Sequence, residues 1–158
     1  MGAINNAFNQ AAGTVAGAAL VVKHAKETEE SKMNTADSTA LVARNQYRSA
    51  KAEANEAVNE AKQPGGLNFQ LAEAEINESE ARKAFNKAVD RKNSSPTTIL
   101  NKMSELKAAK KATQALREKI QAVEDLQKRA EEQRIYAEKA TTMALEAREK
   151  FEKRWGGK

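Results

Sequence analysis

Residues that end helices are confined to two places in the interior of this sequence. The chain has two prolines, Pro64 and Pro96, and between Ala18 and Trp155 its only glycines directly follow Pro64. Proline and paired glycines stop a helix and turn the chain. The motifs "QPGG" at 63–66 and "NSSP" at 93–96 are therefore predicted turns, and Ser95 and Pro96 suit the N-cap and first position of the helix that follows.

These turns, together with changes in composition, divide the sequence into segments. We distinguish an uncharged Ala/Gly-rich segment 1–22, an alanine-seam segment 23–63, a segment 67–92, a long basic segment 97–155 and a tail 156–158. None of them shows the alternation of a strand. Apolar residues recur at spacings of three and four, which predicts helix throughout.

Alanine dominates the predicted contact face of segment 23–63. The chain holds 31 alanines but only four Phe and one Trp, and alanine removes little area from water. We therefore predict an all-α fold: an extended helical hairpin or coiled-coil bundle with one very long C-terminal helix, completed by oligomerisation. The same pattern serves an intrachain hairpin and an intermolecular bundle equally. The predicted oligomer seam is Ala40, Ala43, Tyr47, Ala50, Ala54, Ala57 and Ala61.

The first 22 residues carry no charge. Their strictly apolar part, 11–22, is shorter than the roughly 20 residues that a spanning helix needs. A secretory signal is disfavoured because the positive charges follow the apolar part. Three interpretations remain: a helix packed in an assembly, a permanent span, or a segment that inserts into a membrane in one state only. Helix packing or membrane contact would involve Gly13 and Gly17, which form G-x-x-x-G, and Phe8, Val15 and Val22.

The residues that most enzymes need are scarce. The chain has no Cys and one histidine, His24, so thiol nucleophiles and thiolate or two-histidine metal sites within one chain are excluded. The cluster of Glu73, Glu75, Glu78 and Glu80 does not face one way on a helix, which favours a solvated surface. We predict no catalytic residue, no metal and no cofactor.

Positive charge accumulates late in the chain. Residues 97–158 carry fifteen basic and ten acidic side chains, whereas segments 23–63 and 67–92 are balanced. A solvated helix face is one interpretation, and contact with an anionic partner such as DNA or an acidic wall is the other. The candidate contact residues are Lys102, Lys107, Lys110, Lys111, Arg117 and Lys119. Phe151 and Trp155 form a possible docking tip, or close a stripe that recurs every seven residues from Ala109.

An uncharged start, "MGAINNAFNQAAGTVAGAAL", followed by helices rich in Ala, Gln, Glu, Lys and Arg, resembles the smaller internal virion proteins of short-tailed bacteriophages. It is similar, less closely, to the DNA pilot proteins of small single-stranded phages. The resemblance implies a virion protein stored near the portal with portal or core proteins as partners. It also implies ejection with the genome and a role in a conduit across the host envelope, with residues 1–22 contacting the membrane.

Other interpretations fit the same patterns. One is a soluble scaffold or portal/capsid adaptor, which would be cytoplasmic outside the virion. Another is a membrane-anchored coiled-coil stalk. A third is a nucleic-acid-binding module, which the balanced charge of the first two charged segments disfavours.

Overall fold

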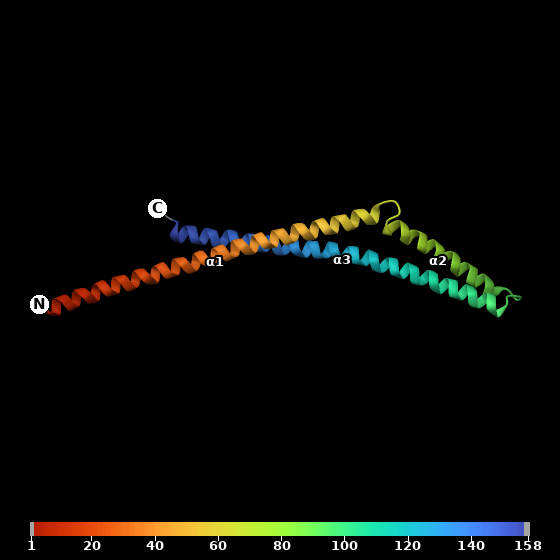
Figure 1. The fold of residues 1–158 in the computed structure, drawn as a ribbon, viewed down its shortest axis with the longest axis horizontal. Coiled ribbons are helices and arrows are strands. Elements are labelled where there is room, and N and C mark those ends of the chain that lie inside the picture. Colours follow the sequence, from red (N-terminus) through yellow and green to blue (C-terminus); the bar gives the residue numbers. More distant parts are fainter. Residues whose placement is uncertain (1, 157–158) are drawn as a thin grey trace. The chain divides into compact units, whose positions relative to one another are not determined.

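Three helices form the described part of the chain, in a computed structural model that describes the backbone of residues 2–156 and the side chains of residues 17–156. Helix α1 spans Gly2–Lys62, α2 spans Leu67–Asp90 and α3 spans Pro96–Trp155 (Figure 1). No strand occurs among these residues. The predicted all-α class is confirmed.

Helix α1 runs without a break through the change in composition between Val22 and Lys23. The sequence predicts a boundary between segments 1–22 and 23–63 because charge begins at Lys23. The helix continues because neither proline nor glycine follows Gly17 until Pro64, and a change from apolar to charged side chains leaves the backbone hydrogen bonds intact.

Two glycines allow the tight turn between α1 and α2. Gly65 has a φ of 78°, a conformation that costs most other residues energy. A Cβ on Gly66 would collide with the backbone oxygens of Glu60, Ala61 and Gln63. The turn therefore depends on both glycines of the "QPGG" motif.

The turn before α3 follows the predicted capping pattern. The Oγ atom of Ser95 accepts a hydrogen bond from the backbone N–H of Thr98 at 3.1 Å, which satisfies one free donor at the start of the helix. Pro96 is the first residue of α3. Both predicted positions are confirmed.

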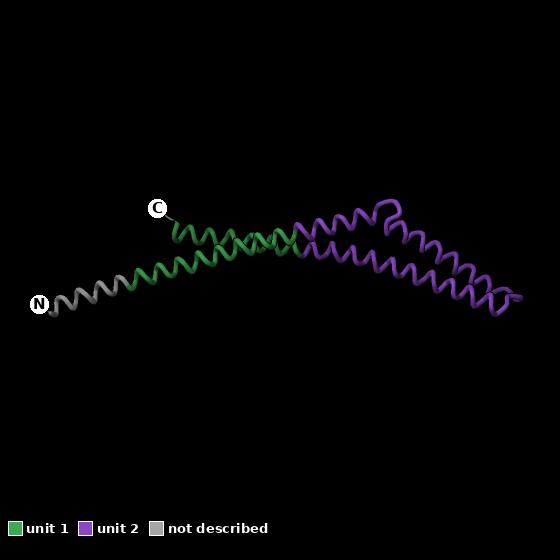
Figure 2. The backbone as a smooth tube through the Cα atoms, in the orientation of Figure 1, with its two compact units in different colours: residues 1–47, 133–158 green, residues 48–132 purple. Residues whose placement is uncertain are grey.

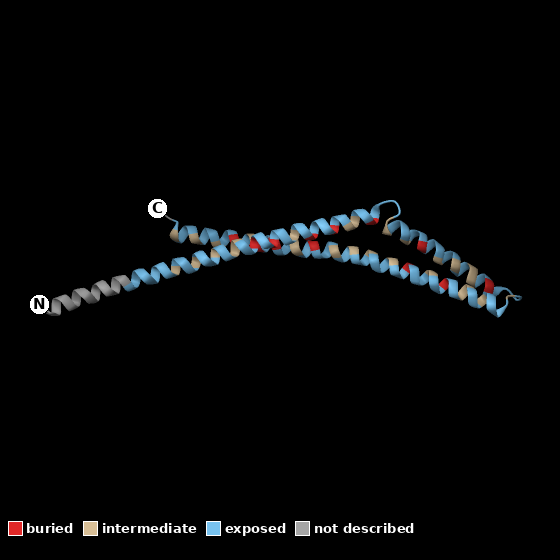
Figure 3. Cartoon of the chain, viewed as in Figure 1, coloured by how far each residue is buried: buried red, intermediate tan, exposed pale blue. Residues whose placement is uncertain are grey.

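Contacts divide the chain into two units. Unit 1 contains residues 1–47 and 133–158, and unit 2 contains residues 48–132 (Figure 2). In unit 1, α1 and α3 run antiparallel, since Asp37 pairs with Arg148 and Glu29 pairs with Arg154. Its core consists of five alanines, with Ala36 and Tyr47 packed against them: Ala40, Ala43, Ala137, Ala140 and Ala144 (Figure 3).

Unit 2 contains two successive pairings of α3. Its first part lies beside α2 (Figure 1), where the fully buried Thr113 hydroxyl donates to the backbone oxygens of Ala109 at 3.0 Å and Ala74 at 3.3 Å. Further along, Ala130 and Leu126 pack against Ala50 and Ala54 at the end of α1. Helix α3 thus packs first against α2 and, further along, against α1.

The buried face of α3 changes phase where its partner changes. Between Leu106 and Phe151, the spacings along the least exposed positions of α3 alternate between three and four, except for two consecutive steps of three, from Ile120 to Val123 to Leu126. Before this irregular step the seam faces α2, and after it the seam faces α1. A three-residue insertion of this kind overwinds a heptad pattern locally. The seam before it contains Leu106, Ala109, Thr113 and Leu116, and the seam after it contains Ala130, Gln133, Ala137, Ala140 and Ala144.

Candidate functional site

The strongest concentration of charge lies at the end of unit 2 where α2 turns into α3. The antiparallel pairing brings residues 82–92 beside the first turns of α3. Residues 82–111, which we call the basic end, carry nine basic and two acidic side chains, a net charge of +7 against +5 for the whole chain. The rest of the molecule is therefore slightly acidic, and its cationic character is local.

The structure brings together four of the six lysine and arginine candidates. Lys107, Lys110 and Lys111 are exposed, and Lys102 forms an ion pair with Glu105 at 3.3 Å. Arg117 lies further along α3 and pairs with Glu75 of α2 at 3.5 Å. Lys119 is also exposed beyond the basic end.

Basic residues of α2 and of the turn after it also belong to this site, although the sequence pattern did not indicate them. The residues concerned are Arg82, Lys83, Lys87, Arg91 and Lys92. Segment 67–92 as a whole carries equal numbers of basic and acidic residues. Its net charge therefore gives no sign of these basic residues. A usable signal was present, because the acidic residues Glu73, Glu75, Glu78 and Glu80 all precede the basic ones, and the "NSSP" turn folds the basic part back onto α3.

The start of the described side chains is apolar and exposed. Leu20, Val21 and Val22 are 67%, 70% and 54% exposed, and nothing lies within 4 Å of a Cβ built on Gly17. The side chains of Phe8, Gly13 and Val15 lie outside the described residues. Within the part of the chain that is described, no helix holds a stretch apolar and long enough to cross a bilayer.

The predicted seam residues of α1 lie on its inner face. Ala40, Ala43 and Tyr47 pack against α3 in unit 1, and Ala50 and Ala54 pack against it in unit 2. Ala57 is partly buried and Ala61 is buried. This face of α1 is therefore occupied by α3 of the same chain.

The C-terminal aromatic residues also face α1. Phe151 is partly buried, and the indole Nε1 of Trp155 donates to Oε2 of Glu29 at 2.6 Å. The other oxygen of Glu29 accepts from Arg154, whose guanidinium lies 4.9 Å from the centre of the Trp155 ring. These residues form a polar clasp that joins the end of α3 to α1.

A second ion pair supports the clasp two turns of α1 away. Arg148 donates to a carboxylate oxygen of Asp37 at 2.7 Å. This hydrogen bond and the negative charge of Asp37 raise the pKa of the Arg148 guanidinium, so the guanidinium stays charged at any physiological pH.

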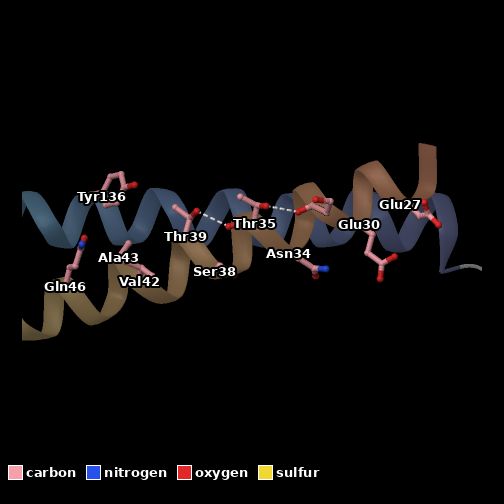
Figure 4. Close-up of a pocket in the computed structure, with 11 residues that line it drawn as sticks. Glu27, Glu30, Asn34, Thr35, Ser38, Thr39, Val42, Ala43, Gln46 and Tyr136 are labelled. Atoms are coloured by element: carbon pink, nitrogen blue, oxygen red, sulfur yellow. Dashed lines mark hydrogen bonds between the residues drawn. The ribbon is translucent and has the colours of Figure 1, made fainter. Parts of the chain in front are cut away.

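A shallow groove runs along one side of unit 1. It follows α1 from Glu27 to Gln46, and Tyr136 of α3 lies over it (Figure 4). Its threonine hydroxyls donate to their own helix, Thr35 to the Ser31 oxygen and Thr39 to the Thr35 oxygen, both within 2.9 Å. Nowhere in the described residues do three carboxylate or histidine side chains gather to hold a metal ion.

Comparisons with known protein families, with curated proteins and with solved structures find no match for this chain.

Proposed function

We propose that this chain is a non-enzymatic structural protein of a phage virion that joins other copies in a helical assembly and leaves with the genome. In this proposal the N-terminal part of α1 is the element that other copies or the host membrane cover. The setting comes from the resemblance of the sequence to internal virion proteins. The need for partners comes from the way the helices are packed.

The observation that carries the proposal is the exposed apolar end of α1. Residues 17–28 are exposed except for Ala25, which is partly buried, and the clasp at Glu29 marks the end of α3. Burying a Val or Leu side chain contributes about 1.5–3 kcal/mol. Leu20, Val21 and Val22 thus form an adjacent group whose burial would stabilise association.

The thin core of unit 1 supports the same proposal. Its buried residues are all alanines, so the two helices gain little from packing on each other compared with helices joined by leucine. Association with other copies through the N-terminal part of α1 would add burial that this core lacks.

The test is the mass of the protein in solution, measured by sedimentation velocity over a hundredfold range of concentration. We expect multiples of the 17.3 kDa chain. The double variant Leu20→Gln, Val21→Gln should shift the equilibrium toward the monomer by tenfold or more, following the burial lost.

The matched control changes a similar exposed pair on the same helix, Leu41→Gln with Val42→Gln; these side chains are 55% and 54% exposed. It should associate like the wild type. A wild type that is monomeric throughout would contradict the proposal, and an equal loss of mass in both variants would show that the N-terminal end is not the contact.

A further inference from the structure

The basic end carries exposed aliphatic side chains among its positive charges. Val89, in the last turn of α2, is 50% exposed, and Leu100, early in α3, is 58% exposed. The buried residues of α2 and of the facing part of α3 are instead Ala74, Ala88, Leu106 and Thr113. Both aliphatic side chains therefore lie in water at the end of the molecule that carries most of its positive charge.

The register of the hairpin puts these residues on one side. Glu75 of α2 and Arg117 of α3 form an ion pair across the two helices. Residues one heptad apart share a face of a helix, so the next level along the hairpin holds Arg82 and Lys110, and the one after that holds Val89 and Met103.

Leu100 and Lys107 belong to the same side of α3. Leu100 and Lys107 are one heptad apart. Met103 follows Leu100 by three residues, and Lys110 follows Lys107 by three. Residues three apart are neighbours on a helix surface, so Leu100 and Lys107 lie beside Met103 and Lys110. This side of the hairpin, Arg82, Val89, Leu100, Met103, Lys107 and Lys110, we call the cationic face.

The cationic face has free positive charge. Arg82 pairs with Glu78 of its own helix at 3.6 Å. No carboxylate among the described residues forms an ion pair with Lys107 or Lys110. The two lysines therefore leave their charge available to an anionic partner.

We propose that the cationic face binds the surface of an anionic lipid bilayer. Such a surface takes both kinds of side chain: the aliphatic ones enter the boundary of the acyl chains, while the lysine stems lie along it and keep their ammonium groups at the phosphates. This site is separate from residues 1–22, and it does not depend on the proposed assembly.

Nucleic acid fits this face less well. Its phosphates would attract Lys107 and Lys110 equally, but Val89 and Leu100 would lie against a charged backbone. The cationic face holds no aromatic side chain on which a base could stack. The exposed side chains of Val89 and Leu100 therefore favour a lipid surface over nucleic acid.

The test is flotation of the full chain with vesicles of phosphatidylglycerol and phosphatidylcholine at a 3:7 ratio, compared with phosphatidylcholine alone. We expect the wild type to float with the anionic vesicles and to lose this binding as salt rises. The variants Lys107→Gln, Lys110→Gln and Val89→Asn, Leu100→Asn should each lower the partition coefficient about tenfold.

Matched controls separate this site from the rest of the chain. Lys128→Gln with Lys139→Gln makes the same change in net charge at exposed positions of α3, and Val42→Asn with Leu145→Asn removes an equally exposed Val and Leu. Both should bind within twofold of the wild type. Circular dichroism and sedimentation should show helicity and mass unchanged in all four variants.

Three results would overturn the proposal. Equal flotation on both vesicle types, unaffected by the variants of the cationic face, would assign membrane binding to another part such as residues 1–22. Loss of binding in the lysine variant but not in the Val89 and Leu100 variant would leave a purely electrostatic patch. Binding of a 30-base-pair DNA duplex, without vesicle binding, would assign the face to nucleic acid.

Discussion

The two units hold their helices together in different ways. In unit 1 the buried residues are alanines, and α1 and α3 are also joined by polar contacts: Asp37 with Arg148, and Glu29 with Arg154 and Trp155. In unit 2 the seam includes larger side chains such as Leu106 and Leu126, and the ion pair between Arg117 of α3 and Glu75 of α2 is longer, at 3.5 Å.

The units also differ in how far apart their partners lie in sequence. The polar contacts of unit 1 join residues 111 to 126 positions apart, whereas α2 and α3 meet across 39 and 42 positions. Loops that bring distant residues together cost more entropy and form more slowly. Unit 2 therefore contains the local hairpin, and the pairing in unit 1 depends on closure over a long stretch of chain.

The largest expected effect is on the alanine core of unit 1. Ala43 is fully buried, so Ala43→Leu should push α1 from α3 and cost about 2–3 kcal/mol. Hydrogen exchange should show faster exchange in residues 33–47 and 133–147, with residues 70–85 and 102–117 unchanged.

The matched control for this change is Ala52→Leu, at an exposed position of the same helix, which should alter exchange little. If Ala43→Leu left both units protected, the close approach of the helices in unit 1 would not limit its stability.

A smaller effect is expected from the buried hydroxyl of unit 2. Thr113→Val keeps the shape of the side chain but removes the hydrogen bonds to Ala109 and Ala74, which should cost about 0.5–1.5 kcal/mol in urea unfolding. Exchange should rise in α2 and the facing part of α3. Thr142→Val, at an exposed position of α3, serves as the comparison, and an equal loss of stability in both variants would argue against a role for the cross-helix bond.

The smallest effect should come from the clasp. Glu29→Gln removes the charge that pairs with Arg154, and because both groups are partly exposed the loss should stay below about 1 kcal/mol. The emission of Trp155 should shift to longer wavelength as the indole gains contact with water. Glu30→Gln changes an exposed neighbour; an identical emission shift in that variant would mean that Glu29 does not hold the indole.

The helices and turns could be predicted because their signals are local. Pro64, Gly65 and Pro96 set the turns, and the spacing of Ala40, Ala43 and Ala50 sets the inner face of α1. The pairing of α3 with two partners could not be predicted, since alanine seams fit a helix of the same chain and of another chain equally well.

Only the α3 part of the basic end could be predicted, because the rest depends on which helices pair. Lys102, Lys107, Lys110 and Lys111 stand out in the sequence, but Lys87 and Arg91 join them only through the fold. The same holds for the exposed pair Val89 and Leu100, whose positions on one side follow from the register that Glu75 and Arg117 reveal.

The irregular step at Ile120, Val123 and Leu126 also limits how the helices can slide. A seam of repeated alanines is degenerate, because moving α1 along α3 by seven residues sets alanine against alanine again at most positions. Such a shift toward the α2 side would set α1 against the other phase of the α3 seam, where its inner face no longer fits. The irregular spacing at Ile120, Val123 and Leu126 thus favours one register of α1 on α3 over registers shifted by seven residues.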